Sequence, residues 1–223
     1  MTSVVFDLDH TLFDRYATMT RCIPLLCKRL DIALSEEQAT ALLIYADRNY
    51  THIGWDKMLV FLNENGMFRK CPEFNDFAEA LFEAFRSTSV PFWFAVPTIE
   101  RLREMGYKIG LITNGSSETQ RAKLGNLGLL NTFDEIIISG EYGIGKPDTA
   151  PFYEMARRLD TETCQMYYVG DNPKNDVEAS RKAGCVPIWV NTTGTWVFPE
   201  IEKPELIVRD VSELPDLLNK NDK

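Results

Sequence analysis

Residues 4–14 read Val-Val-Phe-Asp-Leu-Asp-His-Thr-Leu-Phe-Asp. The apolar, β-branched and aromatic run at 4–6 predicts a buried strand that ends near Asp7. Asp7 and Asp9 follow this strand, and a side-chain alternation that continues here places both on one side of the chain. Two neighbouring carboxylates repel each other unless a cation lies between them or one stays protonated. The pair therefore indicates a metal site or nucleophile-and-acid chemistry, although an isolated Asp-x-Asp is equally an ordinary turn after a strand.

The composition limits the class of protein. The chain has 223 residues, of which 44% are hydrophobic and 26% are charged. These values are ordinary for one large globular domain, or for a domain with a sizeable insert. The formal net charge of −9 argues against a nucleic acid polymer or an anionic membrane as a main partner. An anionic substrate would therefore need a local positive site, from a metal ion, a lysine or backbone N–H groups.

The cysteines and histidines limit the kinds of metal site that the chain can form and indicate its cellular compartment. The five cysteines form no C-x-x-C pair, and we expect reduced, mostly buried thiols. The two histidines are too few for a histidine metal site. No apolar run approaches about 18 residues, and no basic segment precedes an apolar one at the N-terminus. We therefore expect a cytoplasmic protein.

The chain between the first strand and residue 91 has a helical pattern. Apolar side chains recur there at spacings of three and four residues in four segments, 16–30, 35–50, 55–66 and 74–85. Ser35 and Gln38 have the spacing of a capping box at the start of the second helix. The absence of a strand pattern predicts a helical cap domain at 15–91, inserted into a core domain made of 1–14 and 92–223. The aromatic residues just after Pro91 are expected to pack in the core and the hinge.

Beyond Pro97 the pattern alternates between helix and strand. Buried strands are predicted at 107–112, 135–139, 165–169, 186–190 and 206–208. Helices are predicted at 98–105, 117–127, 150–159, 176–183 and 211–219. Strands separated by helices of about ten residues imply parallel βαβ units. The predicted fold class is α/β, with a doubly wound, Rossmann-like parallel sheet and an inserted helical cap domain.

Polar residues follow several of the predicted strands. Thr113 and Asn114 follow the second strand, Lys146 lies in the loop after the third, and Asp171 and Asp176 follow the fourth. Each has an ordinary interpretation as a turn, a helix cap or an exposed loop residue. In a doubly wound sheet, however, ligands bind at the carboxyl ends of the strands. Together with the first acidic pair, these residues therefore predict one site at that edge.

At this point the sequence resembles the haloacid dehalogenase superfamily, in the branch whose helical cap follows the first motif. The matching motifs are Asp7-Leu8-Asp9-His10-Thr11, Thr113-Asn114-Gly115, Lys146-Pro147-Asp148 and Gly170-Asp171 with Asp176. The resemblance extends over nearly the whole chain, because the position of the cap and the order of the strands also agree. It identifies the superfamily but not the substrate.

The resemblance implies a role for each residue of the site. Asp7 would be the nucleophile that attacks phosphorus and forms an aspartyl-phosphate. Asp9 would protonate the leaving alcohol and then activate the hydrolytic water. Thr113 and the Asn114 backbone N–H would bind phosphoryl oxygens, and Lys146 would neutralise charge on the nucleophile and the phosphate.

The resemblance also implies a bound Mg²⁺ ion. Its ligands would be the Asp7 carboxylate, the Asp9 main-chain carbonyl and Asp171, completed by waters and a phosphate oxygen. Asp176 would act behind these ligands, through water or through Lys146. The implied partner is a small phosphorylated metabolite of the nucleotide, sugar-phosphate or phosphoglycolate type. We expect no nucleic acid polymer and no membrane as partner, and a monomer or a homodimer.

Other activities of the same superfamily remain open. Asp9 argues against a dehalogenase, because a halide leaves without a proton whereas an alkoxide needs one. A phosphonate hydrolase would use a cap lysine as a Schiff base, for which Lys28, Lys57 and Lys70 are the candidates. A phosphomutase uses the same core, and a non-catalytic phosphate-binding regulatory module would not need Asp9. Aromatic residues that could stack on a base or sugar, or simply pack in the protein, are Tyr16, Tyr50, Trp55 and Trp93.

Overall fold

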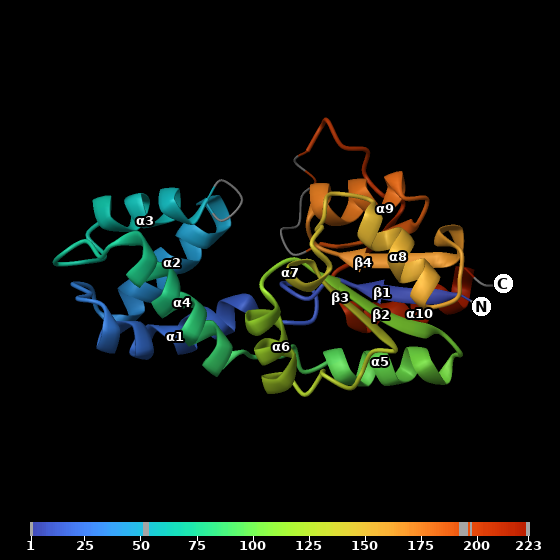
Figure 1. Ribbon diagram of the computed structural model, residues 1–223, viewed down its shortest axis with the longest axis horizontal. Helices are drawn as coiled ribbons and strands as arrows, with labels where there is room; N and C mark the ends of the chain where they lie inside the picture. The colour runs from blue at the N-terminus through green and yellow to red at the C-terminus, as the bar shows by residue number, and fades with distance from the viewer. Residues whose placement is uncertain (1, 51–53, 192–195, 197, 222–223) are drawn as a thin grey trace. The chain divides into compact units, whose positions relative to one another are not determined.

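The computed structural model describes residues 2–50, 54–191, 196 and 198–221 (Figure 1). The chain forms two compact units, one made of Met1–Asp14 with Pro91–Lys223 and the other of Arg15–Val90. We call the first the core unit and the second the helical unit. No helix in the described ranges is both long enough and apolar enough to span a membrane.

The core unit is built on a six-stranded sheet in the order β3-β2-β1-β4-β5-β6. The strands are β1 Ser3–Phe6, β2 Lys108–Thr113, β3 Glu135–Ile138, β4 Met166–Gly170, β5 Val186–Val190 and β6 Leu206–Val208. Every pair is parallel, as the alternation of helix and strand predicted. The chain adds β2 and β3 on one side of β1 and the later strands on the other. The strand order therefore reverses between β1 and β4, which is where ligands bind in such sheets.

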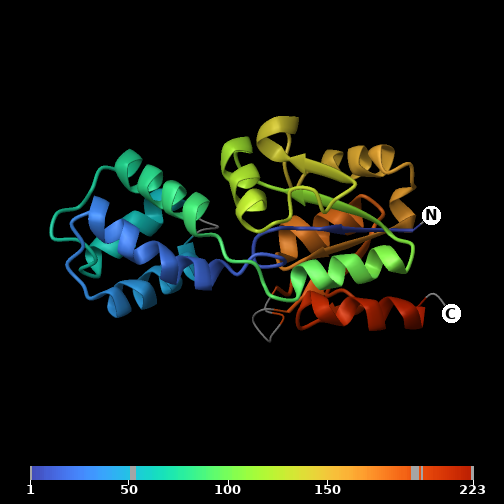
Figure 2. The ribbon, with the colours of Figure 1, turned by 90° about the horizontal axis from the view of Figure 1, so that it is seen from below.

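Helices cover both faces of the sheet. They are α5 Ala95–Glu104, α6 Ser117–Asn126, α7 Ser139–Tyr142, α8 Ala150–Arg158, α9 Ala179–Lys182 and α10 Leu214–Asn221. Helices α5 and α10 pack together on one face (Figure 2). Helix α8 packs against β2 and β3, and a glycine in β2 lets it approach closely. A Cβ on Gly110 would lie 2.7 Å from the Met155 sulfur of α8 and 3.2 Å from a methyl group of Val5.

The helical unit contains α1 Arg15–Arg29, α2 Glu36–Tyr50, α3 Trp55–Glu64 and α4 Phe74–Thr88. Helix α1 packs against both α2 and α4. Helix α2 begins with the predicted capping box, in which the Ser35 N–H donates to Gln38 Oε1 at 3.2 Å and the Gln38 N–H donates to Ser35 Oγ at 3.3 Å. These reciprocal bonds satisfy backbone donors that the first turn of a helix leaves without a partner.

A buried ion pair connects α1 to α2. Arg15 Nη2 and Nε donate to Asp47 Oδ1 at 2.8 and 3.1 Å, and Nε also donates to Oδ2 at 3.0 Å. The guanidinium carbon lies 4.8 Å from the centre of the Phe85 ring of α4. One cation and one carboxylate are therefore joined in a low-dielectric setting, where a pair of this kind is costly to break.

The aromatic residues of the helical unit mostly pack against one another. Tyr50 stacks on Phe61 with ring centres 4.6 Å apart, and Trp55 stacks on Phe82 at 4.5 Å. Arg48 lies over the ring of Tyr16, 4.5 Å from its centre. All four aromatic residues named as stacking candidates thus have partners within the protein, since Trp93 of the core unit meets the Phe94 ring edge-on at 5.5 Å.

Several predictions about packing and local structure were wrong. Trp93 is 83% exposed and does not pack in the core, although Phe92 and Phe94 stack on each other. The five cysteines are free, but only Cys22 and Cys185 are buried, so the thiols are not mostly buried. The helix predicted at 176–183 is a π-helix, η2 Pro173–Glu178, followed by the short α9. The pattern missed α7, whose four residues are too few to show a period.

Candidate active site

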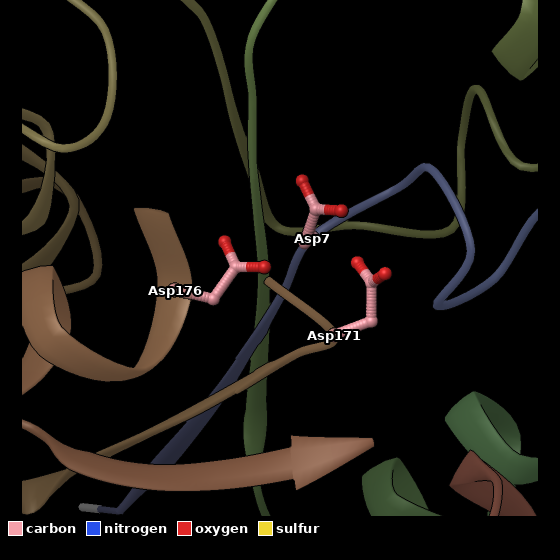
Figure 3. A group of neighbouring side chains, drawn as sticks. All are labelled: Asp7, Asp171 and Asp176. Atoms are coloured by element: carbon pink, nitrogen blue, oxygen red, sulfur yellow. The ribbon is translucent and has the colours of Figure 1, made fainter. Parts of the chain in front are cut away.

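The two central strands end beside each other at the carboxyl edge of the sheet. The Asp7 N–H donates to the Val169 carbonyl of β4 at 2.8 Å, which continues the strand pairing beyond β1. Asp171 follows β4 directly, and Asp176 lies in η2. Figure 3 shows the side chains of Asp7, Asp171 and Asp176 converging from these segments. One carboxylate oxygen from each of the three lies within 4.8 Å of those of the other two.

One lysine balances part of this negative charge. Lys146 is buried, and its ammonium donates to Asp7 Oδ1 at 2.6 Å, to Asp176 Oδ1 at 2.7 Å and to the Tyr168 hydroxyl at 2.7 Å. Tyr168 in turn donates to the Ile112 carbonyl at 3.1 Å. The three protons of the ammonium thus have three oxygen partners, which fixes its position.

Asn114 holds the loop that carries this lysine. Its side-chain amide donates to the Lys146 carbonyl at 2.7 Å, and its carbonyl oxygen accepts the Lys146 N–H at 2.9 Å. A Cβ on Gly145 would lie 2.7 Å from the Asn114 oxygen, so a glycine there leaves room for the amide. The side chain of Asn114 is therefore committed to the loop, and the predicted phosphate contact remains with its backbone N–H.

The side chain of Asp176 is held on every side by the protein. Its Oδ1 accepts from Lys146, and its Oδ2 accepts the Asn172 N–H at 2.9 Å. A Cβ on Gly170 would lie 2.4 Å from its carboxyl carbon, so only glycine permits this approach. Asn172 starts η2 by accepting the N–H groups of Lys174 and Asn175, which places Asp176 one turn later. Asp176 thus contacts Lys146 directly, and its role behind the metal ligands remains a prediction.

The charges of this cluster do not cancel. Burial raises the pKa of Asp7 to about 7, with Lys146 opposing the rise and the charges of Asp176 and Asp9 adding to it. Desolvation by the surrounding protein, together with repulsion from Asp176 and Asp7, raises the pKa of Asp171 well above its ordinary value. Burial lowers the pKa of Lys146, but the carboxylates of Asp176 and Asp7 outweigh it and raise that pKa. Three carboxylates thus surround one ammonium, and a further cation would stabilise them.

The donor set fits a hard divalent cation. The atoms that converge are carboxylate oxygens, which Mg²⁺ and Ca²⁺ prefer, and no histidine or cysteine is among them. Because both oxygens of Asp176 accept hydrogen bonds within the protein, Asp7 and Asp171 are the carboxylates best placed to bind the ion. The predicted ligand from Asp9 is its main-chain carbonyl, and the Asp9 carboxylate is not part of this cluster.

The Asp9 carboxylate instead contacts a helix that the sequence analysis did not connect with the site. Lys123 Nζ of α6 lies 2.8 and 3.1 Å from the two Asp9 oxygens. Gln120 Nε2 donates to Asp9 Oδ2 at 3.2 Å and to Thr113 Oγ1 at 2.6 Å. The structure therefore joins Thr113 to Asp9 through Gln120. A signal was present in the sequence, since 117–127 is predicted as a helix yet offers few apolar residues with which to face a sheet.

The fold and the site together define a class of protein. It is a doubly wound α/β protein with a helical insert after its first strand. At the carboxyl edge of its sheet, a cluster of carboxylates contacts a buried lysine. The chain belongs to the haloacid dehalogenase-like hydrolase family, whose model matches residues 4–190. The resemblance and the fold class predicted from the sequence are therefore confirmed.

Characterised relatives of the chain are phosphatases. Over 98 residues it is 40% identical to the glyceraldehyde 3-phosphate phosphatase of Methanopyrus kandleri, a match that spans 44% of this chain and only 42% of that protein. It is 29% identical to the enzyme of the same name from Methanothermobacter thermautotrophicus, over 98% of this chain and 100% of that protein.

Solved structures of the family share the fold. The putative HAD-hydrolase YfnB from Bacillus subtilis, bound to magnesium, has a TM-score of 0.78 and 23% identity, with 98% of each chain covered. The L-2-haloacid dehalogenase of Xanthobacter autotrophicus has a TM-score of 0.71 and 18% identity over 98% of each chain. At these identities the likeness extends to the fold alone, and the chemistry must be argued from the site.

Proposed function

We propose that the protein is a Mg²⁺-dependent phosphatase that hydrolyses a small phosphomonoester metabolite through an aspartyl-phosphate. The observation that carries this proposal is the buried Asp7, fixed by Lys146 at 2.6 Å within a carboxylate cluster whose charge is not balanced. A nucleophile held beside a cation and a candidate metal site is the arrangement that phosphoryl transfer needs. The phosphatase relatives support it as well.

The proposed reaction has two steps. A carboxylate oxygen of Asp7 forms a bond to phosphorus while the bond from phosphorus to the alcohol oxygen breaks, and Asp9 gives its proton to that oxygen. Water then attacks phosphorus, Asp9 takes a proton from it, and the bond from phosphorus to Asp7 breaks. Inorganic phosphate leaves, and both carboxylates return to their starting state.

The remaining residues stabilise charge. Lys146 offsets the negative charge that Asp7 and the phosphoryl group bring together, while the Thr113 hydroxyl and the Asn114 backbone N–H donate to phosphoryl oxygens. Asp7, Asp171 and the Asp9 carbonyl would hold the Mg²⁺ ion, which would supply positive charge to offset that of the phosphoryl group. Asp176 keeps Lys146 in place.

We propose that residues 15–91 form a cap domain and that residues 1–14 and 92–223 form the core domain. The cap domain would exclude water from the reaction and select the substrate. The insert begins directly after the motif that carries the proposed nucleophile and acid. The segment that returns from it pairs with the end of that motif, where the Phe92 N–H donates to the Leu12 carbonyl at 3.2 Å. We propose a nucleotide, sugar phosphate or phosphoglycolate-type compound as substrate. We also propose that the protein is cytoplasmic and is a monomer or a homodimer.

Asp9 is the residue that favours a phosphatase over a dehalogenase, since only an alkoxide leaving group needs its proton. A phosphonate hydrolase requires a cap lysine whose pKa is lowered by burial. The candidates Lys28, Lys57 and Lys70 are all exposed, so no observation favours that activity.

The test is the release of inorganic phosphate from a panel of nucleotide monophosphates, sugar phosphates and phosphoglycolate. Release is expected with added Mg²⁺ and is expected to stop after treatment with EDTA. Activity that survives complete removal of metal would exclude the metal-dependent mechanism. Failure of every ester to react above the level of an Asp7→Asn variant would exclude a phosphatase.

A further inference from the structure

We infer that Lys123 and Gln120 are positioning residues that hold the Asp9 carboxylate in the orientation needed for proton transfer and couple it to Thr113. This inference rests on the proposed phosphatase function, because Asp9 has a proton to deliver only in that reaction. It concerns α6, which carries none of the residues that the sequence motifs identified.

The first observation is the polar buried face of α6. The buried residues of this helix are Thr119, Gln120, Lys123 and Leu124, of which only one is apolar. A lysine ammonium removed from water is costly unless a carboxylate or other acceptor meets it. Lys123 is 4% exposed, so its burial has to be compensated, and the Asp9 carboxylate does so.

The second observation is a correspondence between the buried lysines and the acidic pair. In the described ranges of the chain, Lys123 and Lys146 are the lysines classed as buried. Lys146 contacts Asp7 at 2.6 Å and Lys123 contacts Asp9 at 2.8 Å. Each carboxylate of the motif thus has its own buried ammonium, from a different segment of the core unit. This allows the two neighbouring carboxylates to be held in different directions.

The contacts at Asp9 fix the orientation of its carboxylate in addition to balancing its charge. Lys123 Nζ reaches both carboxylate oxygens, and Gln120 adds a third contact to Oδ2. While Asp9 is ionised its carboxylate only accepts hydrogen bonds, so the Gln120 atom that faces it is the amide nitrogen. Asp9 must take up a proton before it acts as the acid, and the same contacts hold it in place for that step. The Phe13 ring lies 5.0 Å from Lys123 Nζ and bounds the other side of the ammonium.

The turn before α6 is shaped to allow this contact. Gly115 has a φ of 140°, and a Cβ at this position would lie 3.1 Å from Cγ and Cδ of Gln120. Ser116 caps the helix by accepting the Thr119 N–H, which sets where the first turn begins. Gln120 and Lys123 are three residues apart and therefore share a helix face. The glycine of the second motif thus makes room for the side chain that reaches the first.

Gln120 also determines how Thr113 can act. Its amide donates to Thr113 Oγ1 at 2.6 Å, so the hydroxyl oxygen accepts there and its own proton is available to donate. A phosphoryl oxygen needs a donor of this kind. The same amide group therefore holds the proposed acid and prepares the proposed phosphate ligand, and it fixes the distance between them.

A loss of this support should impair proton transfer more than phosphate binding. Without Lys123, the Asp9 carboxylate can rotate away from the leaving oxygen, and misplaced catalytic groups lose rate even when they remain present. Phosphate esters of acidic phenols leave without a proton, whereas those of less acidic phenols need one. The penalty should therefore grow as the leaving group becomes more basic.

The experiment measures kcat and KM for a series of substituted phenyl phosphates, from 4-nitrophenyl to unsubstituted phenyl, with saturating Mg²⁺. The variants are Lys123→Met, Gln120→Leu and the conservative Lys123→Arg, with Asp9→Asn as the reference. The control is Arg121→Met on the same helix, because Arg121 is half exposed and pairs with Glu141 of α7 at 2.8 Å. Circular dichroism and unfolding temperatures confirm that each variant is folded.

We expect Lys123→Met to lower kcat about 10- to 100-fold for phenyl phosphate, part of the full contribution of a general acid, and only about threefold for the 4-nitrophenyl ester. KM should change little, Gln120→Leu should show the same trend, and Lys123→Arg should restore part of the rate. Arg121→Met should follow the wild type. In an Asp9→Asn background, Lys123→Met should add no further dependence on the leaving group.

Equal losses for all esters, or no loss in either variant, would overturn the inference while leaving the phosphatase intact. A further leaving-group effect of Lys123→Met in the Asp9→Asn background would overturn it too, since the lysine would then act without Asp9. If Lys123→Met does not fold, the leaving-group dependence of Gln120→Leu tests the inference in its place. If wild-type protein releases no more phosphate than Asp7→Asn, the proposed function itself fails, and the inference falls with it.

Discussion

The helical unit and the core unit treat buried charge in different ways. In the helical unit, Arg15 and Asp47 form a pair in which one cation meets one carboxylate with good geometry. At the sheet edge of the core unit, one ammonium from Lys146 meets the carboxylates of Asp7 and Asp176, and Asp171 lies within the same cluster. The first arrangement is complete, whereas the second leaves negative charge to be balanced from outside.

This difference separates a structural ion pair from a functional one. A balanced buried pair stabilises the packing of the helices that carry it and needs nothing further. An unbalanced cluster is costly in the isolated protein, and the cost is relieved when a cation binds or when a carboxyl group takes up a proton. The Lys123 and Asp9 pair is an intermediate case, because it is balanced in charge but lies within reach of the reaction.

The largest expected effect comes from Asp7→Asn. The change removes the attacking oxygen, so phosphate release should fall to background, measured with 4-nitrophenyl phosphate. In the metal-free protein the same change removes one of three mutually repelling carboxylates, and the unfolding temperature should stay constant or rise. Asp47→Asn is the matched control in the helical unit, where the unfolding temperature should fall and the site should keep its chemistry. A fall in stability for both variants would contradict the comparison.

Removal of the metal should have the next largest effect. EDTA should abolish phosphate release, and Mg²⁺ should both restore it and raise the unfolding temperature, because a ligand that binds only the folded state stabilises it. Asp171→Ala should lose this thermal shift, while Asp47→Asn should retain it despite its lower starting temperature. An equal Mg²⁺ shift in Asp171→Ala would remove Asp171 from the metal site.

Asp9→Asn should have an effect that depends on the substrate. The hydrolysis of alkyl phosphates should fall by about 10²- to 10⁴-fold, the range for a general acid, and aryl phosphates with good leaving groups should lose far less. The measurement is kcat for both ester types under the same Mg²⁺ concentration. Equal losses would show that Asp9 contributes charge or structure rather than a proton.

The smallest effect on activity is expected in the helical unit. Arg15→Met leaves the Asp47 carboxylate buried without its main cation, which should cost about 3–5 kcal/mol in the free energy of unfolding. The double variant Arg15→Met with Asp47→Leu should recover most of that loss, because apolar groups of similar volume replace a balanced pair. Urea unfolding followed by circular dichroism measures both. A double variant as unstable as Arg15→Met would show that the ion pair stabilises the protein through its own interactions, and that the single variant's loss does not come only from an unpaired carboxylate.

Much of the fold could be read from local patterns. The strand at Glu135–Ile138 is visible because three consecutive isoleucines have few alternatives to burial. The capping box at Ser35 and Gln38 is visible because its bonds span only three residues. The π-helix at Pro173–Glu178 was missed, because the predicted helix begins only at 176 and no local pattern separates a π-helical turn from an α-helical one.

The sequence by itself determined the order of strands and helices, the helical insert, and the residue types that follow β1, β2 and β4, because these depend on near neighbours along the chain. Only the tertiary structure decided that Asp9 faces Lys123, that Asn114 holds the lysine loop, and that Trp93 is exposed. A polar helix can turn any of its sides toward the sheet, and its rotation is set by packing between residues far apart in sequence. The contact between Asp9 and Lys123 spans 114 residues, which no local pattern can encode.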